Sequence, residues 1–203
     1  MNPRLRMILL KCRAANMPAD NIERAIKKGV GRGEGANYED LTYEIYGPQG
    51  VALLVEVSTD NRNRTASDIR SIVTKNDGSI ATSGSVSRLF HRKGQIIISR
   101  EAANEDPLME LALEAGAEDF KTDENGYEIL TEPADFETVH KQIEAKGIKY
   151  EAAEITSLPV ILVPLAGEAG IAAVNKLIEA LEEHEDVKEV FSNADFPNEA
   201  VKA

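Results

Sequence analysis

The order of strand-like and helical patterns between residues 95 and 157 limits the fold of this 203-residue chain more than any other feature. Four strand-like runs and two helical patterns follow one another there, at residues 95–99, 107–115, 120–122, 127–131, 135–145 and 150–155. Their order is β-α-β-β-α-β, the split-βαβ or ferredoxin-like plan, and Asn125-Gly126 is a hairpin signal within it. Because about sixty residues are marginally stable alone, we expect this unit to pack on a neighbour.

The segments on either side of this unit lack partners of their own. A hairpin is expected at residues 41–57, and further elements are expected at residues 65–75, 86–90, 160–165, 169–183 and 187–191. The simplest arrangement is one discontinuous α+β domain, residues 38–94 with 158–203, into which a ferredoxin-like domain of residues 95–157 is inserted. The predicted fold class is therefore α+β, with two small α/β-sandwich domains of the split-βαβ kind.

The first 37 residues predict a helical hairpin followed by a glycine-rich linker. Apolar residues recur at helical spacing on both sides of Met17-Pro18, where the proline forces a corner. Gly29 suits the end of the second helix, and the alternating glycines after it are typical of a flexible linker. Two short helices bury little surface, so residues 1–37 are interpreted as the remnant of a larger N-terminal helical bundle.

Basic and acidic residues are segregated along the chain, whose formal net charge is −12. Residues 1–37 hold 8 Lys/Arg against 3 Asp/Glu, residues 61–100 hold 8 against 2, and residues 101–203 hold 7 against 25. Such a chain can present a basic face to phosphate groups. The candidate nucleic-acid-binding residues are Arg4, Arg6, Lys11, Arg13, Arg24, Lys27, Lys28, Arg32, Arg62, Arg64, Arg70, Arg88, Arg92 and Lys93.

The segment that joins the hairpin to the next helix supports two interpretations. A helix N-terminus presents free N–H groups, which together with Arg62 and Arg64 could bind a phosphate. Alternatively, Asn63 or Thr65 caps the helix, and the two arginines pair with a neighbouring aspartate, Asp60 or Asp68.

Two other charged segments are open to two interpretations each. Phe90 lies among the basic residues 88–93, where an aromatic ring either stacks on an exposed base or belongs to the core. The acidic residues between 179 and 189 form either a solvated helix face or a docking surface for a basic protein. The acidic C-terminal half is therefore a candidate contact for a basic protein partner.

Motifs for catalysis, metals or cofactors are missing from the sequence. His91, His140 and His184 stand in no metal-binding spacing, and there is no Walker A loop or Gly-x-Ser-x-Gly motif. Cys12 is the only cysteine, so an internal disulfide is excluded and a cytoplasmic location is expected. No apolar run approaches the ~18 residues of a membrane span. We expect no cofactor, no metal site and no enzymatic activity.

Several segments closely resemble the YebC family: Asn2-Pro3-Arg4-Leu5-Arg6, the run from Met17 to Gly29, the run from Thr59 to Thr65, Gly84-Ser85-Val86, the run from Asp186 to Val190, and Ser192-Asn193. The resemblance implies a three-part arrangement and a role in gene expression, because the family is known as probable transcriptional regulators and its mitochondrial relatives as translational activators. Family members usually open with a further basic helical arm. Here Met1 stands directly before Asn2-Pro3, which leaves open whether the arm is truncated or naturally absent.

Three functions compete on these observations. The first is a non-enzymatic, DNA-binding regulator of transcription that contacts phosphates through the basic segments. The second is a ribosome-associated translation factor, whose basic surface would meet ribosomal RNA and whose acidic half would face basic ribosomal proteins. The third is a ligand-sensing or enzymatic α+β protein, because split-βαβ modules host many functions.

Overall fold

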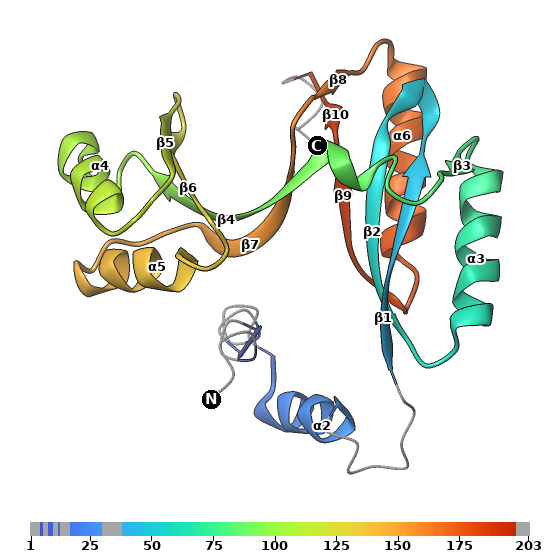
Figure 1. Cartoon of the computed structure of the whole chain (residues 1–203), viewed down its shortest axis with the longest axis horizontal. Helices are drawn as coiled ribbons and strands as arrows, with labels where there is room; N and C mark the ends of the chain where they lie inside the picture. Colours follow the sequence, from blue (N-terminus) through green and yellow to red (C-terminus); the bar gives the residue numbers. More distant parts are fainter. Residues whose placement is uncertain (1–4, 6–7, 10–11, 13–16, 30–37, 198–203) are drawn as a thin grey trace. The chain divides into compact units, whose positions relative to one another are not determined.

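The computed structural model describes residues 5, 8–9, 12, 17–29 and 38–197, and it divides the chain into two compact units (Figure 1). One unit comprises residues 1–87 and 162–203, and the other comprises residues 88–161. The helix expected after Pro18 is present as α2 (Ala19–Gly29), and the Pro18 carbonyl accepts the first N–H bonds of its opening turn. Most of the predicted first helix and the glycine-rich linker lie outside the described residues.

The discontinuous unit is built on a four-stranded antiparallel sheet with two helices on one face (Figure 1). In sheet order the strands are β3 (Ser79–Ile80), β1 (Glu39–Tyr46), β2 (Ala52–Thr59) and β9 (Val187–Ser192). The helices are α3 (Arg62–Lys75) and α6 (Glu168–Glu182). Alternate residues of β2 point toward them, because side chains alternate along a strand, and the core is formed by Leu53, Val55, Val57, Ile69, Val73, Val174, Leu177 and Leu181.

The opposite face of this sheet is partly covered by the segment that follows β3. Glu44 of β1 accepts backbone N–H bonds from Gly84, Val86 and Ser87 at 2.6–2.9 Å, and Val86 is fully buried. Burial alone would raise the pKa of Glu44, but these hydrogen bonds outweigh it and hold the pKa below its usual value. An ionised side chain of β1 therefore fixes the Gly84-Ser85-Val86 motif.

The second unit has the predicted β-α-β-β-α-β order and the strand arrangement β5-β6-β4-β7, which confirms the ferredoxin-like plan. Its elements are β4 (Phe90–Ser99), α4 (Glu105–Glu114), β5 (Asp119–Thr122), β6 (Gly126–Thr131), α5 (Phe136–Ala145) and β7 (Ala152–Pro159). Both helices lie on one face of the sheet (Figure 1). The buried apolar residues of this unit include Ile96, Ile98, Leu108, Ala112, Ile129, Phe136, Val139 and Ile143.

Several element boundaries differ from the sequence-based expectation. The strand expected at residues 86–90 is replaced by a 3-10 turn, η2 (Ser87–Leu89), followed by the start of β4. The strand expected at residues 160–165 is reduced to β8 (Val163–Pro164), which pairs in parallel with β10 (Ala194–Asp195). Along the chain, the boundaries between the two units accordingly fall at residues 87/88 and 161/162. The sequence-based boundaries were 94/95 and 157/158.

Gly94 explains why β4 begins earlier than the sequence predicts, at Phe90 and not after Gly94. The sequence suggested that this glycine separates two segments, but β4 continues through it. A Cβ atom at this position would lie 2.8 Å from Cβ of Phe136 and would overlap with Oγ1 of Thr131. The glycine is therefore required for the close approach of α5 to the sheet.

We predict that Gly94→Ala lowers the free energy of unfolding by about 1–3 kcal/mol, because the added methyl group overpacks the contact with Phe136. Urea unfolding of the whole chain measures the effect. Ser99→Ala, in the same strand, is the control and should stay within about 0.5 kcal/mol of the parent. Equal stability of the two variants would contradict the packing role of Gly94.

Candidate nucleic-acid interface

The N-terminus of α3 is capped by a side chain of the protein itself. Asn61 is the N-cap, and its Oδ1 accepts the Arg64 N–H at 3.1 Å. The hydroxyl of Thr59 in turn accepts the Asn61 N–H at 2.9 Å. The expectation that Asn63 or Thr65 caps the helix is wrong, because the helix begins at Arg62, three residues earlier than predicted.

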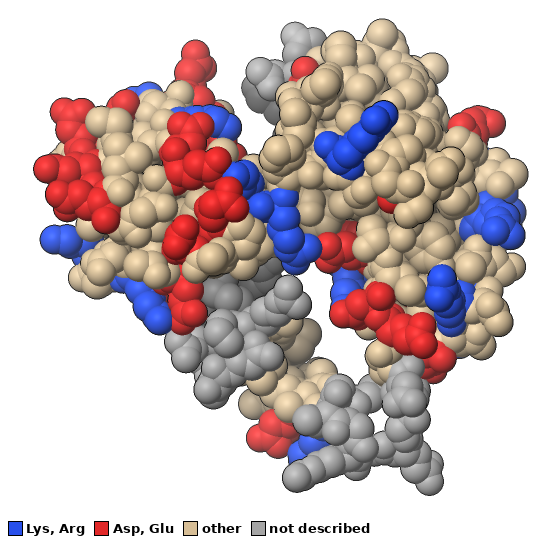
Figure 2. Space-filling model, in the orientation of Figure 1, with Lys and Arg blue, Asp and Glu red and all other residues tan. Residues whose placement is uncertain are grey.

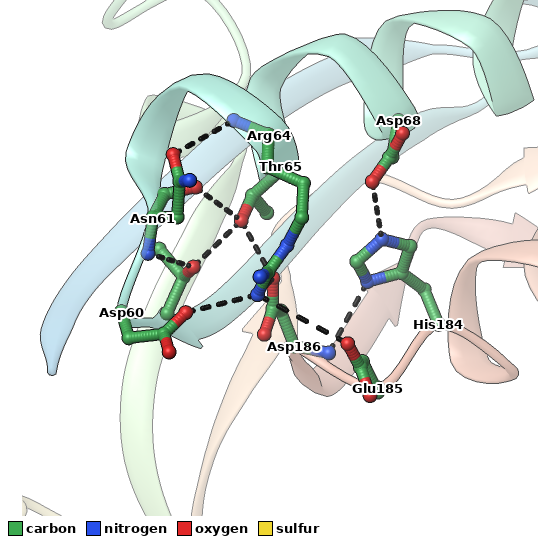
Figure 3. Close-up of polar contacts among 9 residues, drawn as sticks. Asp60, Asn61, Arg64, Thr65, Asp68, His184, Glu185 and Asp186 are labelled. Carbon is green, nitrogen blue, oxygen red and sulfur yellow. Dashed lines mark hydrogen bonds and ion pairs between the residues drawn. The ribbon is translucent and has the colours of Figure 1, made fainter. Parts of the chain in front are cut away.

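A buried carboxylate, Asp186, joins this helix end to the start of β9 (Figure 3). The Thr65 hydroxyl lies 2.6 Å from Asp186 Oδ2 and 2.7 Å from the Thr59 hydroxyl, and all three residues are at least 94% buried. Burial alone would raise the pKa of Asp186, but hydrogen bonds from Thr65 and Thr59, together with the Arg64 charge, outweigh it and lower the pKa. Asp186 is therefore ionised in the folded protein at neutral pH.

Arg64 is committed to this network. Its guanidinium lies 2.9 Å from Asp60 Oδ1 and 3.5 Å from Asp186 Oδ2, with Glu185 at 4.0 Å. Asp68 pairs with His184 at 3.5 Å and has no arginine partner among the described contacts (Figure 3). The carboxylates of Asp60, Glu185 and Asp186 therefore lie around the Arg64 guanidinium, where a bound phosphate would be repelled. For Arg64 the ion-pair interpretation holds.

Arg62 and Arg70 lie on another side of α3 and are not part of this network. Both are exposed, and no ion pair within the described part of the chain involves either of them. They are eight residues apart, about 12 Å along the helix axis, on one helix face. Figure 2 shows basic side chains over α3.

Tyr43 of β1 lies in the electrostatic range of both arginines. Burial is the main influence on its phenol and raises the pKa, while Arg62 and Arg70 act in the opposite direction. Strand β3 pairs only with Ile45 and Tyr46, so β1 forms the sheet edge at Tyr43, which is half-buried. We call Tyr43, Arg62 and Arg70 the α3 basic face.

The basic cluster around Phe90 does not form a comparable platform. Phe90 is 8% exposed, so the core interpretation holds. Lys93 is held by two carboxylates, Glu118 and Glu132. The pKa of Lys93 is raised, chiefly by the hydrogen bonds to these partners. Arg88 and Arg92 are exposed.

The open face of the ferredoxin-like sheet also lacks the features of a base-stacking surface. On the side away from α4 and α5, the central strands carry Lys93, Gln95 and Ile97 on β4 and Glu128 on β6. Gln95 and Lys121 both donate to Glu128. These central positions carry no aromatic residue, so bases have little to stack on. Their two charged residues are also paired, Lys93 with Glu118 and Glu132 and Glu128 with Lys121.

The remaining candidates lie near the N-terminus. On α2, Arg24 donates to Asn21 Oδ1 at 3.2 Å and Lys27 lies 3.7 Å from Glu23, both at the surface. Surface pairs of this kind are weak. The candidates outside the described residues, or whose side chains are not described, are Arg4, Arg6, Lys11, Arg13, Lys28 and Arg32.

Within the described ranges, no cluster of three or more His, Cys, Asp or Glu residues is arranged to hold a metal ion. His140 is buried beside Phe136 and Tyr150, with ring centroids 5.7 and 4.8 Å away. Among the described helices, none combines the length and apolar character needed to cross a membrane.

The fold and the site define a two-unit α+β protein in which a ferredoxin-like unit interrupts a second unit with a basic helix face. The chain belongs to the TACO1/YebC family: residues 38–194 match its second and third domain and residues 1–32 match its N-terminal domain. This membership confirms the resemblance found in the sequence.

Relatives and a solved structure agree with this membership. A protein of Halothermothrix orenii is 50% identical over 204 residues, covering 100% of this chain and 81% of its own length. One of Treponema pallidum strain Nichols is 51% identical over 200 residues, covering 98% and 81%. Both are named probable transcriptional regulatory protein, a name consistent with a regulator of gene expression. The crystal structure of conserved hypothetical protein Aq1575 from Aquifex aeolicus has 44% identity and a TM-score of 0.84, covering 100% of this chain and 83% of that one.

Two residues of the site were missed by sequence reasoning. Asp186 lay in an acidic stretch that is typical of a solvated surface, and only the fold brings it to α3. Tyr43 alternates with Leu41 and Ile45, a signal that it points to the helix side of the sheet. Its nearness to Arg62 and Arg70 could not be predicted from spacing.

We predict that Asp186→Asn lowers the free energy of unfolding by about 1–3 kcal/mol at neutral pH, because Arg64 and Thr65 lose an ionised partner. A carboxylate whose pKa is lowered by folding stabilises above its unfolded pKa of about 3.9 and loses that contribution as pH falls through its folded pKa. The difference between parent and variant should therefore shrink below about pH 3.9.

Chemical denaturation at a series of pH values measures this difference. Glu185→Gln is the matched control, because Glu185 is exposed and lies 4.0 Å from Arg64, and it should change stability by less than about 0.5 kcal/mol. A gap between Asp186→Asn and the parent that persists unchanged at acidic pH would show that Asp186 does not act through its charge.

Proposed function

We propose that this chain is a non-enzymatic, cytoplasmic regulator of gene expression that binds nucleic acid through the α3 basic face. The observation that carries the proposal is the contrast between neighbouring arginines of one helix. Arg64 is held by Asp60 and Asp186, whereas Arg62 and Arg70 are exposed and have no ion pair in the described part of the chain. Exposed, uncompensated guanidinium groups are suited to bidentate contact with phosphate.

The geometry of the α3 basic face favours contact with a backbone more than readout of a sequence. Two arginines whose backbone positions are about 12 Å apart along a helix can contact two phosphates of one strand. The half-buried Tyr43 adds an aromatic ring whose phenol is influenced by the charges of both arginines, and an aromatic ring suits contact with an unpaired base. The exposed side chains of Arg24, Lys27, Arg88 and Arg92 remain predicted contacts elsewhere on the chain.

A second candidate is a ribosome-associated translation factor, and the charge of the inserted unit favours it. Residues 88–161 contain 8 Lys/Arg and 16 Asp/Glu, so this unit would be repelled by a bare DNA duplex. A ribosomal surface offers phosphates and basic proteins side by side. The α3 basic face would then contact ribosomal RNA, and co-sedimentation with ribosomes at moderate salt, in the absence of duplex binding, would favour this candidate.

We predict that Arg62→Ala with Arg70→Ala weakens binding to a DNA duplex or to ribosomes and lowers the salt dependence of binding. Loss of two phosphate contacts should reduce the slope of log affinity against log salt by about 1.8 on duplex DNA and by about 1.4 on single strands. Electrophoretic shift of a duplex and ribosome co-sedimentation, each at several salt concentrations, measure the change.

The matched control is Lys149→Ala with Lys176→Ala, which removes the same charge from exposed positions outside α3. It should leave the slope of log affinity against log salt within experimental error of the parent value. Both double variants should have the same unfolding temperature as the parent. Equal loss of affinity in the two double variants would show that net charge, and not the α3 basic face, governs binding. Absence of binding by the parent to either target would refute the proposed function itself.

A further inference from the structure

The ferredoxin-like unit carries a groove of about 420 Å³ between the start of α4 and the segment after α5. Its lining includes the partly exposed apolar side chains of Leu111 and Ile148. Two carboxylates of α4, Glu110 and Glu114, and the basic residue Lys146 also line it. Both glutamates are exposed.

These two glutamates have no basic ion-pair partner among the described residues, unlike several other acids of the same unit. Glu118 and Glu132 are paired with Lys93, and Glu128 is paired with Lys121. No ion pair among the described residues involves Glu110 or Glu114. Helix α4 carries four acids and no lysine or arginine, and Figure 2 shows acidic side chains gathered over it.

The position of Glu110 and Glu114 is unfavourable for the helix alone. Like charges four residues apart repel each other across one turn, and Glu114 is the last residue of α4, where the helix dipole disfavours negative charge. A cation bound there would relieve both effects. The acidic character of the whole helix also excludes a nucleic acid as the occupant.

We propose that this groove binds a basic segment of a partner protein, with an apolar side chain against Leu111 and Ile148 and flanking lysines or arginines against Glu110 and Glu114. A groove of this size accommodates one or two side chains, so the segment docks as a short linear motif. This site is separate from the α3 basic face and does not depend on the proposed nucleic-acid contact.

The test uses a fluorescent synthetic peptide that repeats Lys-Leu-Lys-Lys, titrated into the full-length chain and followed by anisotropy. The docked residues are mapped by amide chemical shifts in the isotope-labelled protein. Glu110→Lys with Glu114→Lys should weaken binding by about tenfold, because two ion pairs become repulsive. Ala103→Trp fills the groove without a change of charge. It should also abolish the changes in amide chemical shift that the peptide causes at Leu111 and Ile148.

Glu179→Lys with Glu182→Lys is the matched control, because it makes the same charge change on exposed positions of α6. It should bind the peptide within about twofold of the parent. Far-ultraviolet circular dichroism and thermal melting establish that each variant is folded. Shifts confined to the groove and lost in both groove variants support the proposal. Equal weakening in both charge-reversal variants, unchanged binding by Ala103→Trp, or shifts spread over all acidic surfaces would overturn it.

Discussion

The discontinuous unit depends on the buried carboxylate of Asp186. Its hydrogen bond with Thr65 links residues 121 positions apart in the sequence, on either side of an inserted unit. A backbone bond from Ser58 N–H to the Asp186 carbonyl, at 2.8 Å, reinforces the same junction. A buried charge is costly unless it is paired and hydrogen-bonded. The hydroxyls of Thr59 and Thr65 and the guanidinium of Arg64 provide those partners.

Other family-like motifs also serve the long-range assembly of the unit. Asn193 accepts the Ala52 N–H through its Oδ1 at 2.7 Å, and its own N–H donates to the Ala52 carbonyl at 3.2 Å. This exchange fixes the register of β9 beside β2. Glu44 holds the Gly84-Ser85-Val86 motif against β1 through backbone bonds. These polar residues therefore serve the fold first. Arg62 and Arg70, which form no ion pair among the described residues, are the leading candidates for binding.

That distinction separates the two surfaces proposed for binding. On α3 the fold pairs Arg64 and leaves Arg62 and Arg70 exposed, while in the ferredoxin-like unit it pairs Glu118, Glu128 and Glu132. Glu110 and Glu114 of α4 have no ion pair among the described residues and line the groove. The two proposals thus place a cationic face and an anionic groove on different units of one chain.

The sequence by itself determined the α+β class and the ferredoxin-like order, because periodicity and turn signals are local properties. It also determined the family, through runs such as Thr59–Thr65. Only the tertiary structure decided that β4 runs through Gly94, since the reason is the approach of α5. It alone decided that Asp186 pairs with Arg64 and that the charges of Arg62 and Arg70 influence Tyr43. These residues are distant along the chain and are brought together only when the sheet and α3 pack.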